Sequence, residues 1–331
     1  MRLFVLIPCR NEERVIARKL ENLRAIAWPA AAAPHRVVVV DDGSQDQTAL
    51  LARDFVAEFR PDAELCVIQN TQRAGKPGAM RCGLELLEPG FELVVLSDAD
   101  VELADAALTA LAAAFEREPR LGMACGAQRF VGVDGTGDAS AGWDRWTARV
   151  RQLESRLGAL YSVHGQLLAW RARLGLLPRL GIAADDIALA LEVRAKGLRV
   201  ELVRDAVFLE RKTPPGPDAD AQALRRARAY LQVVRAVRPR LPGWLGRLQC
   251  ALYRALPPMA STLTWILLAA VALVPCLAFQ GWWRAAGLVC VWLALGSSPG
   301  RRWLRLVSII ARARDEERRA TLSESWEMTR P

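Results

Sequence analysis

Short apolar runs alternate with segments of helical periodicity over the first 130 residues, and this rhythm limits the possible folds more than any other feature of the sequence. Continuous apolar runs are typical of strands buried on both faces of a parallel sheet. Ligands of such open sheets bind beyond the carboxyl ends of the strands. The sequence therefore predicts an α/β domain with a mostly parallel central sheet and a ligand site at one edge. The four runs are Leu3–Ile7, Val37–Val40, Leu65–Ile68 and Leu93–Leu96.

Charge and hydropathy set the last quarter of the chain apart. The net charge is +9, and basic residues concentrate on both sides of Ala255–Trp283, which has no charged residue. Within it, Met259–Phe279 is long enough to cross a bilayer of ~30 Å, and Ala285–Ser298 could return as a second, shorter span. Basic flanks around a long apolar run indicate a membrane rather than nucleic acid, and they place both ends of this hairpin in the cytoplasm.

Residues 243–258, just before this run, have a tryptophan and several leucines near one face of a helix. They could form an interfacial membrane helix or an ordinary amphipathic helix, and the adjoining apolar run favours the first. These features predict a catalytic domain of residues 1–240 and a region of residues 241–331 with an interfacial helix, one or two spans and a basic cytoplasmic tail. Seven scattered cysteines without a CxxC pair favour a reducing compartment.

Two acidic motifs follow predicted strands. Asp41 and Asp42 end the second run, where they could accept hydrogen bonds from a base or a ribose, or could belong only to a turn and a helix cap. Asp98 and Asp100 follow the fourth run. Carboxylates at this spacing can hold Mg²⁺ or Mn²⁺ on a diphosphate, because hard cations take oxygen ligands and leave positions open for phosphate. The preceding apolar strand makes this common pattern informative.

Two further groups of polar residues come later in the chain. Asp185 and Asp186 open a predicted helix. A carboxylate there could be a general base or an N-terminal cap; we favour the cap for Asp185, and both interpretations stay open for Asp186. Gln222, Arg225 and Arg226 lie within about one helical turn. A cationic helix near a cleft could stabilise a departing diphosphate, or it could be a solvated or membrane-facing basic surface.

In this order and with these gaps, the motifs resemble the family 2 glycosyltransferases with a GT-A fold. Polysaccharide synthases and ceramide glucosyltransferases, which are membrane-bound members, share this set together with C-terminal membrane helices. The resemblance implies a GT-A nucleotide-sugar-binding domain from about Phe4 to Leu231. Its carriers are IPCRNEE (7–13), VVVVDDGSQDQT (37–48), RAGKPGAM (73–80), VVLSDADV (94–101), HGQLLAWR (164–171), ADDIALALEVRAKG (184–197) and QALRR (222–226).

The resemblance also implies roles for single residues. Asp186 matches the last position of the family's Thr-Glu-Asp, which is the general base, and Asp98 and Asp100 match the metal-binding DxD. Arg226 stands where processive members carry a tryptophan, so the resemblance does not extend to processivity. The residues expected around the nucleotide are Pro8, Glu12, Asp41, Asp42, Lys76 and Asp98, and those expected in catalysis are Asp186, Gln222, Arg225 and Arg226.

The resulting expectation is an inverting glycosyltransferase at the cytoplasmic face of the membrane. It would use Mg²⁺ or Mn²⁺ and a nucleotide sugar, with a UDP-sugar as the default donor, and a lipid-linked or glycan acceptor, with partner proteins for export. One alternative is a phosphatase of the haloacid dehalogenase type, whose strand-DxD-Val signature fits residues 96–101. The other is a non-catalytic membrane scaffold that retains a degenerate transferase domain.

Overall fold

The computed structural model describes residues 1–57, 59–71, 75–132, 137–213, 216–237, 241–255, 266 and 298–319. These residues fall into two compact units. The first holds the described residues up to 213 together with 241–246, and the second holds 216–237, 247–255, 266 and 298–319. The predicted catalytic domain of residues 1–240 thus extends over both units.

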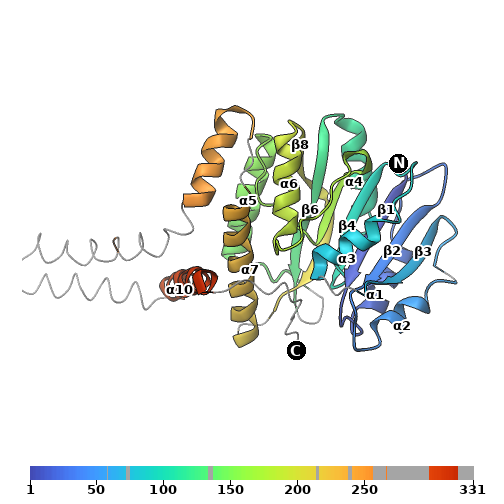
Figure 1. The fold of residues 1–331 in the computed structure, drawn as a ribbon, viewed down its shortest axis with the longest axis horizontal. Coiled ribbons are helices and arrows are strands. Elements are labelled where there is room, and N and C mark those ends of the chain that lie inside the picture. Colours follow the sequence, from blue (N-terminus) through green and yellow to red (C-terminus); the bar gives the residue numbers. More distant parts are fainter. Residues whose placement is uncertain are drawn as a thin grey trace, which may run out of the picture. The chain divides into compact units, whose positions relative to one another are not determined.

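The first unit is built on an eight-stranded sheet with the order β3-β2-β1-β4-β7-β6-β8-β5 (Figure 1). The strands β1 to β4 run parallel, and the antiparallel β7 joins them to the parallel pair of β6 and β8. The α/β expectation is confirmed, and all four apolar runs are strands. The bounds are β1 Leu3–Cys9, β2 His35–Asp41, β3 Ala63–Gln69, β4 Leu93–Ser97, β5 Val101–Leu103, β6 Leu121–Val131, β7 Leu167–Arg171 and β8 Arg199–Arg211.

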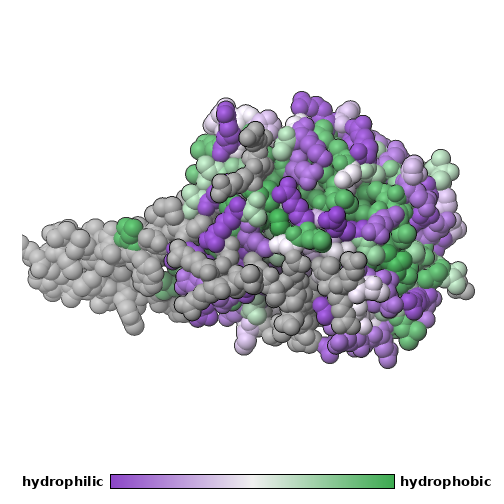
Figure 2. Space-filling view, viewed as in Figure 1, coloured by the Kyte–Doolittle hydropathy of each residue, from purple (hydrophilic) through white to green (hydrophobic). Residues whose placement is uncertain are grey.

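Helices cover both faces of this sheet, which is why its central strands are apolar throughout. Because successive side chains of a strand point to opposite faces, Leu3 and Val5 pack with α1 (Ile16–Ala25), α2 (Thr48–Arg53) and α4 (Ala107–Arg117). Phe4 and Leu6 pack on the other face with α3 (Gly75–Leu84) and α6 (Asp185–Ala195). Hydrophilic side chains gather around the rim of the unit, with apolar ones over its middle (Figure 2).

Three sequence expectations for the first unit are modified. The apolar stretches VELV (200–203) and AVFLE (206–210) predict two short strands, but residues 199–211 form one continuous strand, β8. The sequence predicts an amphipathic helix over residues 143–160, and the observed helix α5 (Gly142–Arg156) ends earlier. The sequence also predicts Trp146 and Trp170 in the core; Trp146 is 55% exposed, whereas Trp170 is buried. A helical pattern indicates which residues share a face, but it does not say how much of that face another element covers.

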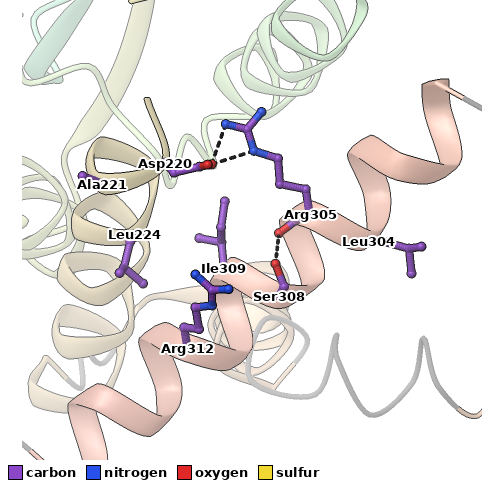
Figure 3. Close-up of a pocket in the computed structure, with 8 residues that line it drawn as sticks. All are labelled: Asp220, Ala221, Leu224, Leu304, Arg305, Ser308, Ile309 and Arg312. Atoms are coloured by element: carbon purple, nitrogen blue, oxygen red, sulfur yellow. Dashed lines mark hydrogen bonds and ion pairs between the residues drawn. The ribbon is translucent and has the colours of Figure 1, made fainter. Parts of the chain in front are cut away.

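The second unit pairs α7 (Pro217–Ala236) with α10 (Ser298–Arg319). Arg305 of α10 forms an ion pair with Asp220, and Arg228 of α7 forms one with Glu316. A cavity of about 500 Å³ lies between the two helices (Figure 3). It is lined by Asp220, Ala221, Leu224, Leu304, Arg305, Ser308, Ile309 and Arg312.

The predicted membrane spans lie outside the described part of the chain. Of Met259–Phe279 only Ile266 is described, and Ala285–Ser298 is described only at its last residue. Among the described residues, no helix is both long and apolar enough to cross a bilayer. Residues 243–255 are helical, as expected for the segment before the apolar run.

Candidate active site

The loops that follow β1 and β2 are joined by reciprocal hydrogen bonds at the carboxyl edge of the sheet. The strands run in register, so Cys9 lies opposite Asp41. Beyond them, the Asn11 N–H donates to Ser44 Oγ at 2.9 Å, and the Gln45 N–H donates to Asn11 Oδ1 at 2.9 Å. Asn11 has a φ of 54°, a left-handed conformation that asparagine tolerates better than most residues. These bonds give the candidate nucleotide site a fixed floor, and Asn11 was not among the residues predicted for it.

Asp41 and Asp42 have different surroundings although they are neighbours. Oδ1 of Asp41 accepts hydrogen bonds from the Ser44 N–H and hydroxyl groups, which fixes the turn after β2. Asp42 is fully buried, and its two oxygens accept from Asn70 Nδ2 at 2.6 Å and from the Gly75 N–H at 3.1 Å. Asp42 therefore joins the end of β3 to the start of α3, which holds the helix that carries Lys76.

Pro8 and Glu12 lie beside this floor. Pro8 is on β1, opposite Val40. Glu12 is buried; its N–H donates to Thr48 Oγ1 at 2.7 Å, and its carbonyl accepts from the N–H groups of Val15 and Ile16 at the start of α1. The structure thus brings the residues predicted from the first two motifs to one edge of the sheet.

Asp98 and Asp100 lie just beyond β4 on the same edge. Both are partly exposed, while Ala99 between them is buried in the turn that connects β4 to β5. The Asp98 N–H donates to the Gln166 carbonyl at 3.1 Å, which ties this loop to the residues before β7. Oδ1 of Asp98 lies 2.6 Å from Lys76 Nζ.

The donor set of this pair fits a hard divalent cation. Both candidate ligands are carboxylates at the exposed end of a strand, and carboxylate oxygens are what Mg²⁺ and Mn²⁺ prefer. Within the described residues, no group of three or more His, Cys, Asp or Glu side chains could hold a metal ion by itself. A ligand such as a diphosphate can supply further oxygens.

Lys19 lies fully buried beneath this loop and was not predicted from the sequence. Its Nζ donates to Ser97 Oγ at 2.7 Å and to the Val101 carbonyl at 2.9 Å. Burial lowers the pKa of Lys19 to about 7, although Asp98 and Asp100 act in the opposite direction. The sequence signal is a lysine within the apolar stripe of α1, where Ile16, Leu20 and Leu23 are its buried neighbours.

Asp185 and Asp186 form the first turn of α6. Asp185 is buried, and its Oδ2 has no hydrogen-bond partner among the described residues. Asp186 is partly exposed and accepts from the Ile187 N–H at 2.8 Å. A Cβ atom at Gly165 would lie only 3.0 Å from Asp186 Oδ2, so a glycine there lets the carboxylate approach the backbone. Burial raises the pKa of both carboxyl groups, that of Asp185 to about 7, and Lys76 opposes this shift.

Lys76 is the electrostatic centre of the site. Burial works against its charge, but Asp98, Asp185 and Asp186 outweigh that effect and raise its pKa. The motif after β4 and the motif that opens α6 therefore act on one lysine, although they are almost ninety residues apart in the sequence.

Gln222, Arg225 and Arg226 lie on α7, in the second unit. By helical periodicity, Gln222 and Arg226 lie on the opposite side of α7 from Asp220, Leu224 and Arg228, which contact α10, and Arg225 lies at the edge between the two sides. Their role near the carboxylates of the first unit stays a prediction from the sequence.

Comparisons with known proteins agree with this fold. Residues 4–167 match the family described as Glycosyl transferase family 2. The beta-monoglucosyldiacylglycerol synthase of Trichormus variabilis is 30% identical over 116 residues, 34% of this chain and 23% of the relative. The human dolichyl-phosphate beta-glucosyltransferase is 32% identical over 102 residues, 30% of this chain and 31% of the relative. The match thus spans less than a third of each of these relatives.

Two solved structures share the architecture. The mannosyltransferase PcManGT from Pyrobaculum calidifontis, in complex with GDP-Man and Mn²⁺, has a TM-score of 0.73 and 26% identity, and the match covers 96% of this chain and 86% of that one. S. aureus TarS 1–349 in complex with UDP-GlcNAc has a TM-score of 0.51 and 19% identity, and the match covers 77% and 71% of the two chains.

The chain therefore has a GT-A-like fold and the sequence features of a glycosyltransferase domain. Its residues 4–167 form a glycosyl transferase family 2 domain. The comparisons agree with the predicted glycosyltransferase class and not with the phosphatase alternative.

Proposed function

We propose that the protein transfers a sugar, with inversion, from a nucleotide sugar to a lipid acceptor at the cytoplasmic face of a membrane. The observation that carries this proposal is the ion pair between Asp98 Oδ1 and Lys76 Nζ at 2.6 Å, with Asp185 and Asp186 near enough to help raise the pKa of Lys76. A site with acidic residues from two elements around one partly buried lysine can hold a metal–diphosphate on one side and a proton acceptor on the other.

Asp186 is the general base in this proposal. It is the more exposed acid of its pair, so an acceptor hydroxyl can reach it, and burial raises its pKa toward the range that suits proton abstraction near neutral pH. Asp186 takes the hydroxyl proton, and the acceptor oxygen attacks the anomeric carbon while the bond to the nucleoside diphosphate breaks. The proposal assigns Gln222, Arg225 and Arg226 to stabilising the departing diphosphate. Asp98 and Asp100 would hold a divalent cation, which would supply charge neutralisation.

In this proposal Pro8, Glu12 and Asp41, at the carboxyl edge of the sheet, accommodate the nucleoside. PcManGT was solved with GDP-Man and TarS with UDP-GlcNAc, so the fold accepts either nucleotide. Two relatives are named beta-monoglucosyldiacylglycerol synthase and dolichyl-phosphate beta-glucosyltransferase, and these names support a lipid acceptor. We keep a UDP-sugar as the first donor to test.

The helix of residues 243–255 supports the membrane part of the proposal. Four large apolar side chains near one face of it are exposed, with Trp244 at 71%. Such a face beside arginines suits an interface between headgroups and acyl chains. The apolar run that follows supplies the anchor, and partner proteins for export remain part of the expectation for this region. The four residues are Trp244, Leu245, Leu248 and Leu252.

The test uses the full chain in lipid nanodiscs with Mn²⁺ and a panel of labelled UDP- and GDP-sugars. Diacylglycerol, a polyprenyl phosphate and a soluble oligosaccharide serve as separate acceptors. The expected result is transfer of one labelled sugar to a lipid, with an inverted anomeric configuration by NMR. Transfer only to the oligosaccharide would contradict the lipid acceptor, and a retained configuration would contradict the role of Asp186.

A further inference from the structure

One buried side chain, that of Lys19, forms hydrogen bonds to the residues on both sides of the Asp98–Asp100 segment. Ser97 immediately precedes Asp98, and Val101 immediately follows Asp100. Lys19 Nζ donates to the hydroxyl of Ser97 at 2.7 Å and to the carbonyl of Val101 at 2.9 Å. A single atom on α1 therefore closes the loop that carries both carboxylates, by bonds to its two ends.

We propose that Lys19 is the positioning residue of the Asp98–Asp100 pair and sets the geometry in which these carboxylates meet a metal–nucleotide complex. Amine and ammonium groups can each donate two hydrogen bonds, so this role does not depend on the charge of the lysine. The role rests on the proposed function in one respect, which is that Asp98 and Asp100 hold the cation.

A purely structural role for Lys19 would predict something else. A buried lysine is costly to desolvate, and its replacement by an apolar residue of similar length is often neutral or stabilising. If the side chain at position 19 only filled the core between α1 and the sheet, methionine would fill it without the cost of burying an amine. Residues that orient a metal ligand without touching the metal typically change metal affinity by ~10–100-fold when they are removed.

The chain offers a matched control on the same helix. Asn22, one turn beyond Lys19, also ties α1 to β5: its Nδ2 donates to the Leu103 carbonyl at 2.9 Å, and its Oδ1 accepts from the Leu103 N–H at 2.8 Å. Lys19→Met and Asn22→Leu each remove two hydrogen bonds that α1 makes to the β4–β5 region. Only the first pair of bonds brackets the acidic residues.

The experiment measures Mn²⁺-dependent binding of UDP and GDP to the full chain by calorimetry, with the Tm of each variant. Lys19→Met is expected to weaken Mn²⁺–nucleotide binding by ~10-fold or more with an unchanged or higher Tm, and to leave the weaker metal-free binding in EDTA unaltered. Asn22→Leu is expected to keep wild-type metal dependence with a lower Tm. Ser97→Ala removes one of the two contacts, so it should fall between wild type and Lys19→Met and add little to that variant when combined with it.

Three results would overturn the proposal. Wild-type metal dependence in Lys19→Met would show that the acidic loop holds its geometry without the lysine. Equal losses in Lys19→Met and Asn22→Leu would show a general tie between α1 and the sheet. Nucleotide binding by the wild type that ignores Mn²⁺ would remove the metal role together with this proposal. Absence of sugar transfer by the wild type, with Mn²⁺-dependent nucleotide binding intact, would instead contradict the proposed function and leave the role of Lys19 standing.

Discussion

At the scale of single residues, two adjacent acidic side chains in the site differ in their exposure to solvent. Asp185 and Asp186 are neighbours in the first turn of α6, yet Asp185 is buried and Asp186 is partly exposed. Their shared partner Lys76 favours the charged form of both. Exposure therefore decides which of them can receive a proton from an acceptor, and a sequence of two aspartates cannot reveal it.

The first prediction concerns Asp186. Asp186→Asn keeps the shape of the side chain and removes the base, so it should lower the rate of transfer by ~10²–10⁴-fold with nearly unchanged nucleotide-sugar affinity. Single-turnover kinetics and calorimetry measure the two quantities. Asp205→Asn, an exposed position on β8, is the matched control. Normal transfer by Asp186→Asn would mean that the base is a different residue.

The second prediction concerns Asp185 and pH. Its folded-state pKa of about 7 lies above the ordinary value of 3.8, so between these values the folded protein binds more protons than the unfolded one. Its contribution to the free energy of unfolding therefore falls as pH rises through this window. Asp185→Asn should be more stable than wild type at pH 8, by about 2–4 kcal/mol more than at pH 4. Chemical denaturation at both pH values measures this, and a pH-independent difference would contradict it.

At the scale of elements, the close approach of α3 to the sheet places Lys76 in the site. A Cβ atom at Gly83 would lie 2.3 Å from Leu6 Cδ1 and 2.8 Å from Val40 Cγ2, so only glycine allows this packing without a shift. The N-terminal end of α3 is held by the bond from the Gly75 N–H to Asp42. The carboxylate of Asp42 therefore holds the N-terminal end of α3. Near its C-terminal end, the absence of a side chain at Gly83 lets the helix pack closely against the sheet.

The third prediction follows from this packing. Gly83→Ala should destabilise the protein, because overpacking costs ~1–3 kcal/mol and outweighs the ~1 kcal/mol that alanine gains in a helix. Gly142→Ala in α5 is the control, since a Cβ there meets nothing within 4 Å. Thermal unfolding compares the two variants. Equal Tm values would show that Leu6 and Val40 move aside at little cost.

The strands could be predicted from the sequence because burial on both faces leaves continuous apolar runs, and the acids at their ends follow from that. Lys19 and Asn11 could not. Lys19 lies on the apolar face of α1, and only the three-dimensional structure shows that its amine reaches Ser97 and Val101. The role of Asn11 depends on a loop thirty residues away in the sequence. Contacts between loops leave no periodic signal.

At the scale of the whole molecule, the chain consists of a sheet-based unit and a helical unit that carry different parts of the proposed chemistry. The first holds the acidic cluster with Lys76, and the second holds Gln222, Arg225 and Arg226. In the sequence, the uncharged run Ala255–Trp283 and the basic residues on both sides of it lie between or within the segments that form the second unit. The membrane proposal is therefore tested best on the intact protein.

The fourth prediction is that the full chain stays in the membrane pellet after alkaline carbonate extraction and after washing in 1 M salt. A span of apolar residues resists both treatments, whereas salt screens the attraction of basic residues to anionic headgroups. Immunoblotting of pellet and supernatant measures the distribution. Release by salt alone would show that the arginines, and not Met259–Phe279, hold the protein.

Because α7 packs against α10, the second unit cannot complete its folding until α10 has been synthesised. More than sixty residues separate the end of α7 at Ala236 from the start of α10 at Ser298, so translation at ~5–20 residues per second leaves α7 without its partner for several seconds. During that interval the first unit can already fold, while Leu224 and its neighbours are open to chaperones or to lipid. The helix that carries Gln222, Arg225 and Arg226 is thus among the last parts of the chain to acquire its native packing.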